Sequence, residues 1–88
     1  MFIVLSIYSG IPTKQCVMYY SLENAIESII NMINKDEYYE IYDNNENKIG
    51  ITKDNFKDIF EKENNVWKLK KEYQFEIIDN THYYIIET

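Results

Sequence analysis

The sequence contains no arginine, a single cysteine, one proline and two glycines, and it has no long hydrophobic run. Because one cysteine cannot form a disulfide within the chain, packing alone has to hold the fold together, and Cys16 is best interpreted as a buried structural thiol. No apolar run approaches the ~20 residues of a membrane span, and no basic leader precedes Phe2–Ile7. These absences predict a soluble, cytoplasmic protein without a membrane segment.

Positive charge is also scarce, since 15 acidic residues stand against nine lysines and the formal net charge is -6. This balance disfavours direct binding of nucleic acid, because contacts to phosphates need a basic surface. It favours a basic protein partner, since complementary fields speed the encounter and fix its register. The chain of 88 residues, 45% of them hydrophobic, is expected to form one domain, 1–88, around a single core.

One amphipathic helix, expected within Ser21–Lys35, organises the rest of the chain. Ser21 is suited to cap its N-terminus, and Glu23 lies where the helix dipole favours an acid. The apolar residues recur at three- and four-residue spacing and share one stripe: Leu22, Ala25, Ile26, Ile29, Ile30 and Ile33. Because the remaining segments are short and rich in β-formers, strands have to cover this stripe.

Three hairpins are expected around the helix. They pair Met1–Ser9 with Gln15–Tyr20, Tyr38–Asp43 with Lys48–Thr52, and Tyr73–Ile78 with His82–Glu87. Met1–Ser9 is apolar on both faces, which is typical of a central strand. In the second hairpin, alternation places Tyr39, Ile41, Ile49 and Ile51 on the buried face.

A second, shorter helix is expected over Lys53–Lys62, with Thr52 as its cap. Its apolar stripe is narrow, which predicts a shallow position on the surface or over a sheet edge. Val66–Leu69 fits either a short strand or an extended link. Together these elements predict an α+β fold: a mainly antiparallel sheet built from hairpins, with the long amphipathic helix packed on one face and a second short helix.

No motif for catalysis, cofactor binding or metal binding withstands inspection. Asp43–Asn47 has the alternating oxygens of a calcium loop, but Lys48 stands where that loop needs glycine, so a polar hairpin turn is the better interpretation. His82 is the sole histidine, and neither Cys16 nor a carboxylate lies at ligand spacing from it. We therefore expect a protein that is not an enzyme and that uses no cofactor or metal.

Tyrosine is more abundant than a structural role requires. Nine tyrosines are present, and three adjacent pairs fall inside expected strands: Tyr19-Tyr20, Tyr38-Tyr39 and Tyr83-Tyr84. Because successive strand residues point to opposite faces, one member of each pair should point inward and the other outward. Tyrosine is a good β-former, and it is also enriched in binding interfaces, so both interpretations stay open.

Acidic residues crowd the second hairpin and one face of the helix. With the outward tyrosines, they form the predicted partner-binding surface: Tyr38, Glu40, Tyr42, Asp43, Glu46, Glu23 and Glu27. In size, acidity and lack of motifs the chain resembles the small phage-encoded inhibitors of bacterial defence systems, anti-CRISPR proteins among them, and toxin-immunity proteins share these features. The resemblance implies an inhibitor whose acids stand in for phosphates and occlude a nucleic-acid-binding channel.

A small-ligand binder is the alternative hypothesis. A nucleotide base would stack on a tyrosine or on Trp67, and its phosphates would be held by lysines: Lys14, Lys68, Lys70 and Lys71. The two hypotheses separate in a melting experiment, because a bound nucleotide would stabilise the folded state. A homodimer is compatible with both.

Overall fold

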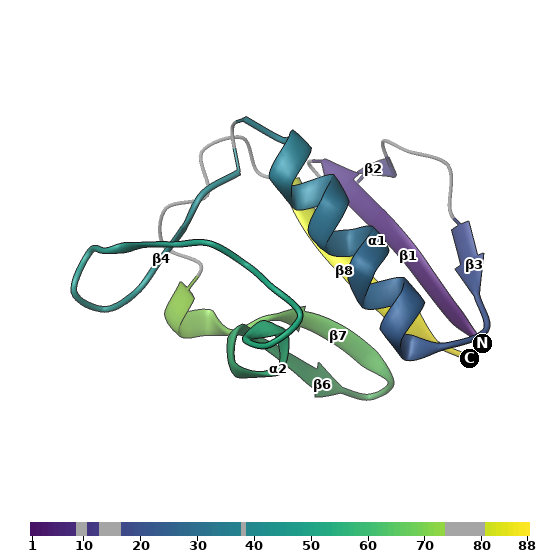
Figure 1. The fold of residues 1–88 in the computed structure, drawn as a ribbon. Helices are drawn as coiled ribbons and strands as arrows, with labels where there is room; N and C mark the ends of the chain where they lie inside the picture. Colours follow the sequence, from purple (N-terminus) through teal and green to yellow (C-terminus); the bar gives the residue numbers. More distant parts are fainter. Residues whose placement is uncertain (9–10, 13–16, 38, 74–80) are drawn as a thin grey trace.

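The structure is a computed structural model that describes residues 1–8, 11–12, 17–37, 39–73 and 81–88. Its elements are β1 (Phe2–Tyr8), β2 (Ile11–Pro12), β3 (Val17–Tyr19), α1 (Leu22–Lys35), β4 (Ile41–Tyr42), β5 (Lys48–Ile49), α2 (Phe56–Ile59), β6 (Phe60–Glu63), β7 (Val66–Leu69), the 3-10 helix η1 (Lys71–Tyr73) and β8 (Thr81–Glu87). The main sheet has the order β2-β1-β8-β7-β6, with β3 also paired to β1, and all its described pairings are antiparallel. The predicted α+β fold is confirmed (Figure 1).

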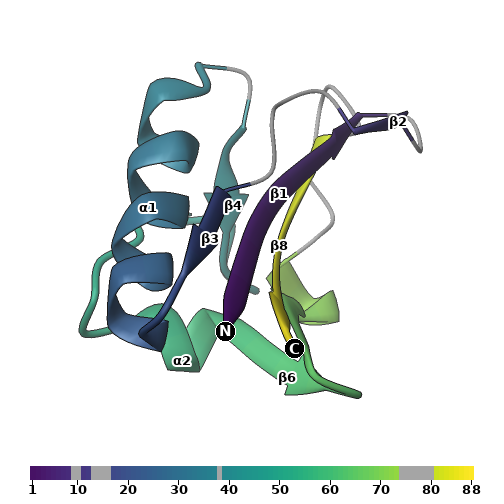
Figure 2. The same ribbon diagram turned by 90° about the vertical axis from the view of Figure 1, so that its right-hand side faces the viewer.

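α1 has the boundaries and the buried face that its sequence predicts. The Ser21 hydroxyl accepts a 3.2 Å hydrogen bond from the backbone N–H of Asn24, and the helix ends where the N–H of Asp36 donates to the carbonyl of Ile33. The helix lies against one face of the sheet, over β1 and β8 (Figures 1 and 2). Leu22 is partly buried, and the other members of the predicted stripe are buried: Ala25, Ile26, Ile29, Ile30 and Ile33.

β1 is the central strand that its apolar sequence predicts. It pairs with β8 over its whole length, from Phe2 opposite Glu87 to Tyr8 opposite Thr81. Its other edge is shared by β3, opposite Phe2–Val4, and by β2, opposite Ile7–Tyr8. The pairing of β1 with β3 confirms the first hairpin, although β2 lies in a segment that was expected to be a loop. The first and last strands therefore lie side by side (Figure 1).

The second helix is shorter than predicted, because the chain turns into a strand at Phe60. α2 covers only Phe56–Ile59, and β6 pairs with β7 in a hairpin. The two residues between these strands, Asn64 and Asn65, have φ values of 51° and 65°. Asparagine tolerates this left-handed backbone, and a two-residue turn of this kind matches the twist of paired strands. The prediction of a helix as far as Lys62 is therefore wrong.

The apolar face of α2 is completely buried, although Lys57 and Asp58 on its other side are exposed. The ring of Phe56 stacks on Phe60 at a centroid distance of 4.7 Å and meets Trp67 at 5.7 Å. Thr52 is not the cap that was predicted, because α2 begins after Asn55. Thr52 instead stabilises the turn before α2: its hydroxyl accepts from the N–H of Asn55, and its own N–H donates to the Asn55 side chain.

The second hairpin is confirmed as the antiparallel pair β4–β5, with Ile41 opposite Ile49 and Tyr42 opposite Lys48. Its strands are shorter than expected, but the predicted buried face is correct, since Tyr39, Ile41 and Ile51 are buried and Ile49 is half-buried. Tyr38 lies outside the described residues.

The third expected hairpin falls mostly outside the described residues, because its first strand and turn include 74–80. Tyr73, expected to open that strand, instead ends the 3-10 helix η1. Thr81 was expected in the turn, but it is the first residue of β8. Cys16 and Lys14 also lie outside the described residues.

The two tyrosine pairs that are fully described split between inside and outside as predicted. Tyr83 is buried and meets the ring of Tyr39 edge-on at 4.9 Å, whereas Tyr84 is half-buried. Tyr19 is half-buried against α1, whereas Tyr20 is 89% exposed. In the described part of the chain, no helix has the length and apolar character needed to cross a membrane.

Candidate functional site

The acidic hairpin, defined here as residues 36–49, projects from the body of the fold at the left of Figure 1. Pairing of β4 with β5 gathers Glu40, Tyr42 and Lys48 on its outward face. The Tyr42 hydroxyl donates to Oε2 of Glu40, and the Lys48 ammonium lies 3.8 Å from the other carboxylate oxygen. Glu40 therefore fixes the Tyr42 side chain through a hydrogen bond and also forms an ion pair with Lys48.

Asp43 shapes the tip of the acidic hairpin. Its Oδ1 accepts hydrogen bonds from the backbone N–H groups of Asn45 and Asn47, both at 2.9 Å. The bond from Asn47 contributes most to lowering the pKa of this carboxyl below its ordinary value. A carboxylate that closes its own turn in this way explains the alternating polar residues of the segment. Within the described ranges, no group of three or more His, Cys, Asp or Glu residues is placed to hold a metal ion.

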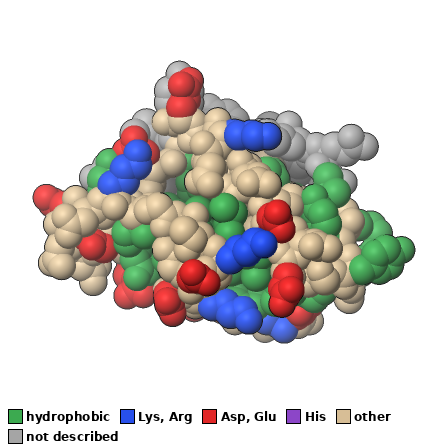
Figure 3. Space-filling model, in the orientation of Figure 1, with side chains coloured by type: hydrophobic (Ala, Val, Ile, Leu, Met, Phe, Trp, Pro, Cys, Tyr) green, Lys and Arg blue, Asp and Glu red, His purple; other side chains and the backbone are tan. Residues whose placement is uncertain are grey.

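Most of the charge on the acidic hairpin is not neutralised locally. Glu37 and Glu46 are exposed, and neither forms an ion pair with a described lysine. Between positions 36 and 48 the sequence carries five acids and a single lysine, Lys48. Figure 3 shows carboxylates at the left-hand end, over the hairpin, and along the lower rim.

The structure does not bring all the predicted site residues onto one surface. Glu40, Tyr42, Asp43 and Glu46 share the acidic hairpin, which packs along the C-terminal end of α1. Glu23 and Glu27 lie near the other end of the helix, about 13 to 20 Å away along its axis. Oε2 of Glu27 pairs there with the Lys53 ammonium at 3.1 Å. The helix acids are therefore a separate surface, partly neutralised by the segment before α2.

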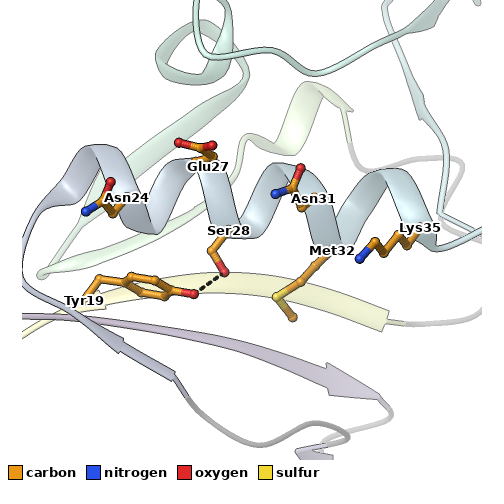
Figure 4. Close-up of a pocket in the computed structure, with 7 residues that line it drawn as sticks. All are labelled: Tyr19, Asn24, Glu27, Ser28, Asn31, Met32 and Lys35. Atoms are coloured by element: carbon orange, nitrogen blue, oxygen red, sulfur yellow. Dashed lines mark hydrogen bonds between the residues drawn. The ribbon is translucent and has the colours of Figure 1, made fainter.

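A groove of about 530 Å³ between α1 and β3 is a feature that the sequence analysis missed. Figure 4 shows its lining: Tyr19, Asn24, Glu27, Ser28, Asn31, Met32 and Lys35. Tyr19 comes from β3, and its hydroxyl donates to Oγ of Ser28 at 2.9 Å, which fixes the strand against the helix. The Glu27 side chain points away from Tyr19, whereas Met32 lies on the same side of the helix as Tyr19. The helix side nearest β3 is therefore mainly uncharged.

The groove adjoins the exposed large hydrophobic side chains of the described residues. These are Met1 at 41%, Val17 at 46%, Met18 at 58% and Tyr20 at 89% exposure. Hydrophobic side chains gather at the right-hand end of Figure 3, over β3. The sequence carried a signal for this surface, because Val17–Leu22 contains no charged residue, but it did not show that β3 would be exposed.

Trp67 and Lys68, two of the residues proposed for nucleotide binding, do not face one site. Trp67 and Lys68 are consecutive in β7, so their side chains point to opposite faces of the sheet. The Trp67 ring packs against Phe56, and the Lys68 ammonium lies 3.1 Å from the Glu63 carboxylate. This arrangement argues against a nucleotide site that combines Trp67 with Lys68, whereas Lys68 and Tyr84 line a common pocket.

None of the protein-family models compared with the chain matches it, and neither the curated proteins nor the solved structures contain a significant match. The proposals below therefore rest on the residues and geometry of this chain alone.

Proposed function

We propose that this protein is a non-enzymatic interaction protein that binds a basic partner through the acidic hairpin and inhibits it. The observation that carries the proposal is the unbalanced charge of this projecting segment, in which Lys48 is the one cation among five acids. A projecting segment with a net negative charge attracts a basic surface at long range and is accessible to it.

Tyr42 supplies the second ingredient of such a surface. Interfaces draw most of their affinity from a few anchors, among which tyrosine is enriched. The hydrogen bond to Glu40 already orders the Tyr42 side chain, so less conformational entropy is lost when a partner contacts it. Charged groups at the rim then set the association rate, while the ring sets the dissociation rate.

The chemistry of the hairpin fits a partner that handles nucleic acid. A nucleic-acid channel is lined by lysine and arginine, which bind phosphates, and carboxylates can occupy the same positions. Glu37, Glu40, Asp43 and Glu46 would then compete with the nucleic acid for the channel, and binding would itself be inhibition. This is the mode of action that the resemblance to phage-encoded inhibitors of bacterial defence implies.

The test compares two double charge reversals as baits in affinity capture. Glu37→Lys with Glu46→Lys alters the hairpin at two exposed positions that take part in no described ion pair. Asp43 is left intact, because its carboxylate holds the turn. Asp54→Lys with Asp58→Lys changes the net charge by the same amount at exposed positions outside the hairpin.

We expect a basic protein to be retained by the wild type and by the Asp54/Asp58 control but lost from the hairpin variant. The captured protein, once purified, should lose nucleic-acid binding when this chain is added. Equal retention by all three baits, or no basic protein retained by the wild type, would contradict the proposal. Circular dichroism of each bait shows that the fold is intact.

A further inference from the structure

The outer edge of β3 has no strand beside it in the described part of the chain. β3 pairs with β1 on one side, through Tyr19 opposite Phe2, Met18 opposite Ile3 and Val17 opposite Val4. Alternate residues of an antiparallel strand direct their N–H and C=O groups away from the paired side, so β3 presents free backbone groups outward. Proteins usually protect such an edge with charge, proline or a bulge. Val17–Tyr19 has neither charge nor proline, and only its length of three residues limits the edge.

The side chains along this edge are apolar and exposed, as Val17, Met18 and Tyr20 show. The groove that continues from them has no net charge, since one acid and one lysine, Glu27 and Lys35, line it beside the uncharged Asn24, Ser28, Asn31 and Met32. The same chain carries a net charge of -6, so two copies repel one another over most of their surfaces. The β3 side is where a second copy can approach with the least repulsion.

We infer that the β3 edge, together with the groove beside it, is the interface of a symmetric homodimer in which β3 pairs antiparallel with β3 of a second copy. A two-fold axis at Met18 sets this residue beside Met18 of the second copy, and Val17 beside Tyr19 of the second copy. Such an interface uses the same patch on both subunits, as two-fold symmetry requires. The two main sheets become one continuous sheet.

The side chains that line the groove would add to the surface that such a dimer buries. Three strand spacings separate β1 from its counterpart, so the two copies of α1 would lie about 14 Å apart on the same face of the joined sheet. Helices in direct contact lie at roughly 8–10 Å, so the extra space must be filled by side chains. Asn24, Asn31 and Met32 of each copy line this space, and the asparagine amides can hydrogen-bond across the axis.

The interface is at the opposite end of the molecule from the acidic hairpin (Figure 1). A dimer would therefore leave both hairpins free and would carry two copies of the surface proposed for partner binding. The inference does not rest on the proposed function, because self-association is measured on the purified protein alone.

The experiment is sedimentation velocity from about 5 to about 500 µM, a range that detects weak dimers. We expect the wild type to approach twice the monomer mass of 10.7 kDa. Met18→Lys places two like charges side by side at the axis and should weaken the dimer at least about tenfold. Asn44→Lys adds the same charge at the exposed hairpin tip and should leave the dimer unchanged.

Disulfide trapping tests the register independently. Paired Cα atoms in an antiparallel ladder lie about 4.5 to 5.5 Å apart, within the span of a disulfide. In a Cys16→Ser background, Met18→Cys should form a covalent dimer under mild oxidation, and Asn44→Cys should not. A wild type that stays monomeric across the range overturns the inference. The inference is also overturned if the dimer persists in Met18→Lys and Met18→Cys does not trap it. If Met18→Lys does not fold, the result of the disulfide trapping decides.

Discussion

The hydroxyl of Tyr83 donates a 2.7 Å hydrogen bond to Oδ2 of Asp36. Tyr83 is in the last strand, and Asp36 is the C-cap of α1, so this bond joins the centre of the sheet to the end of the helix where the acidic hairpin begins. The tyrosine ring is buried and rests edge-on against Tyr39 of the hairpin segment. One side chain thus fixes three parts of the fold relative to one another.

We expect Tyr83→Phe to lower the free energy of unfolding by about 1–2 kcal/mol, because it removes a hydrogen bond to a carboxylate and keeps the ring. Tyr84→Phe is the matched control, since Tyr84 is half-buried and its hydroxyl is in no described hydrogen bond, and it should change stability by less than about 0.5 kcal/mol. Urea denaturation measures both. Equal stabilities for the two variants would show that the Tyr83–Asp36 bond contributes nothing.

Phe56→Ala should destabilise the protein by about 3–5 kcal/mol, the usual cost of truncating a buried phenylalanine. The reason is that the Phe56 ring is fully buried between Phe60 and Trp67 although its helix has only four residues. Lys57→Ala, at the exposed neighbouring position, should be nearly neutral. Thermal or urea unfolding measures the stability of both variants. A small loss of stability for Phe56→Ala would mean that α2 packs more loosely than described.

Asn65→Gly should raise stability by about 0.5 kcal/mol, because glycine adopts a positive φ at less cost than any other residue. Asn65 has a φ of 65° in the turn between β6 and β7. Asn65→Val, which cannot easily adopt this conformation, should be clearly destabilising. If this segment were helical, the order of the two variants in urea unfolding would be reversed, because glycine is a poor helix former.

The pKa of Asp43 gives a pH dependence with a defined sign. Hydrogen bonds from the backbone, that of Asn47 first, hold this pKa below its ordinary value of 3.8, so ionised Asp43 favours the folded state. That contribution is fully present above pH 3.8 and is lost as the pH falls through the lower, folded pKa. Asp43→Asn keeps an acceptor oxygen without the charge. The wild type should therefore be more stable than the variant at pH 7, and the difference should shrink as the pH falls below 3.8.

Tyr42→Ala should speed dissociation of a captured basic partner by about tenfold or more, since it removes the aromatic anchor of the acidic hairpin. Tyr42→Phe keeps the ring but loses the bond to Glu40, so its effect should be smaller. Surface-binding kinetics measure the association rate and the dissociation rate separately. An unchanged dissociation rate for Tyr42→Ala would exclude Tyr42 as an anchor.

The long helix and the second hairpin could be predicted because local pattern and final packing agree there. The stripe from Ala25 to Ile33 has one period over more than two turns, and Ser21 marks its start. In the hairpin, the alternation around Ile41 and Ile49 matches the observed register. The polar segment between them closes through Asp43, as a turn does.

β6 could not be recognised from its composition, because Phe60–Glu63 has charged residues suited to a helix. The segment is a strand because it pairs with β7, with Phe60 opposite Leu69 and a tight turn at Asn64–Asn65. Two asparagines between two β-compatible runs were the signal that could have found this hairpin. The separation of Glu27 from the acidic hairpin, and the exposure of β3, depend on tertiary placement and have no local signal.

The pairing of β1 with β8 has a consequence for how the chain reaches its native state. β1 leaves the ribosome well before β8, yet the two strands are neighbours along seven residue pairs at the middle of the sheet. Contacts between such distant segments slow folding, because the intervening chain has to be closed into a loop first. Before β8 is made, β1 can pair only with β2 and β3 among its described partner strands, so the edge of β1 that β8 covers stays open while the intervening segments are synthesised. An open apolar strand edge of this kind is prone to aggregation until its partner strand covers it.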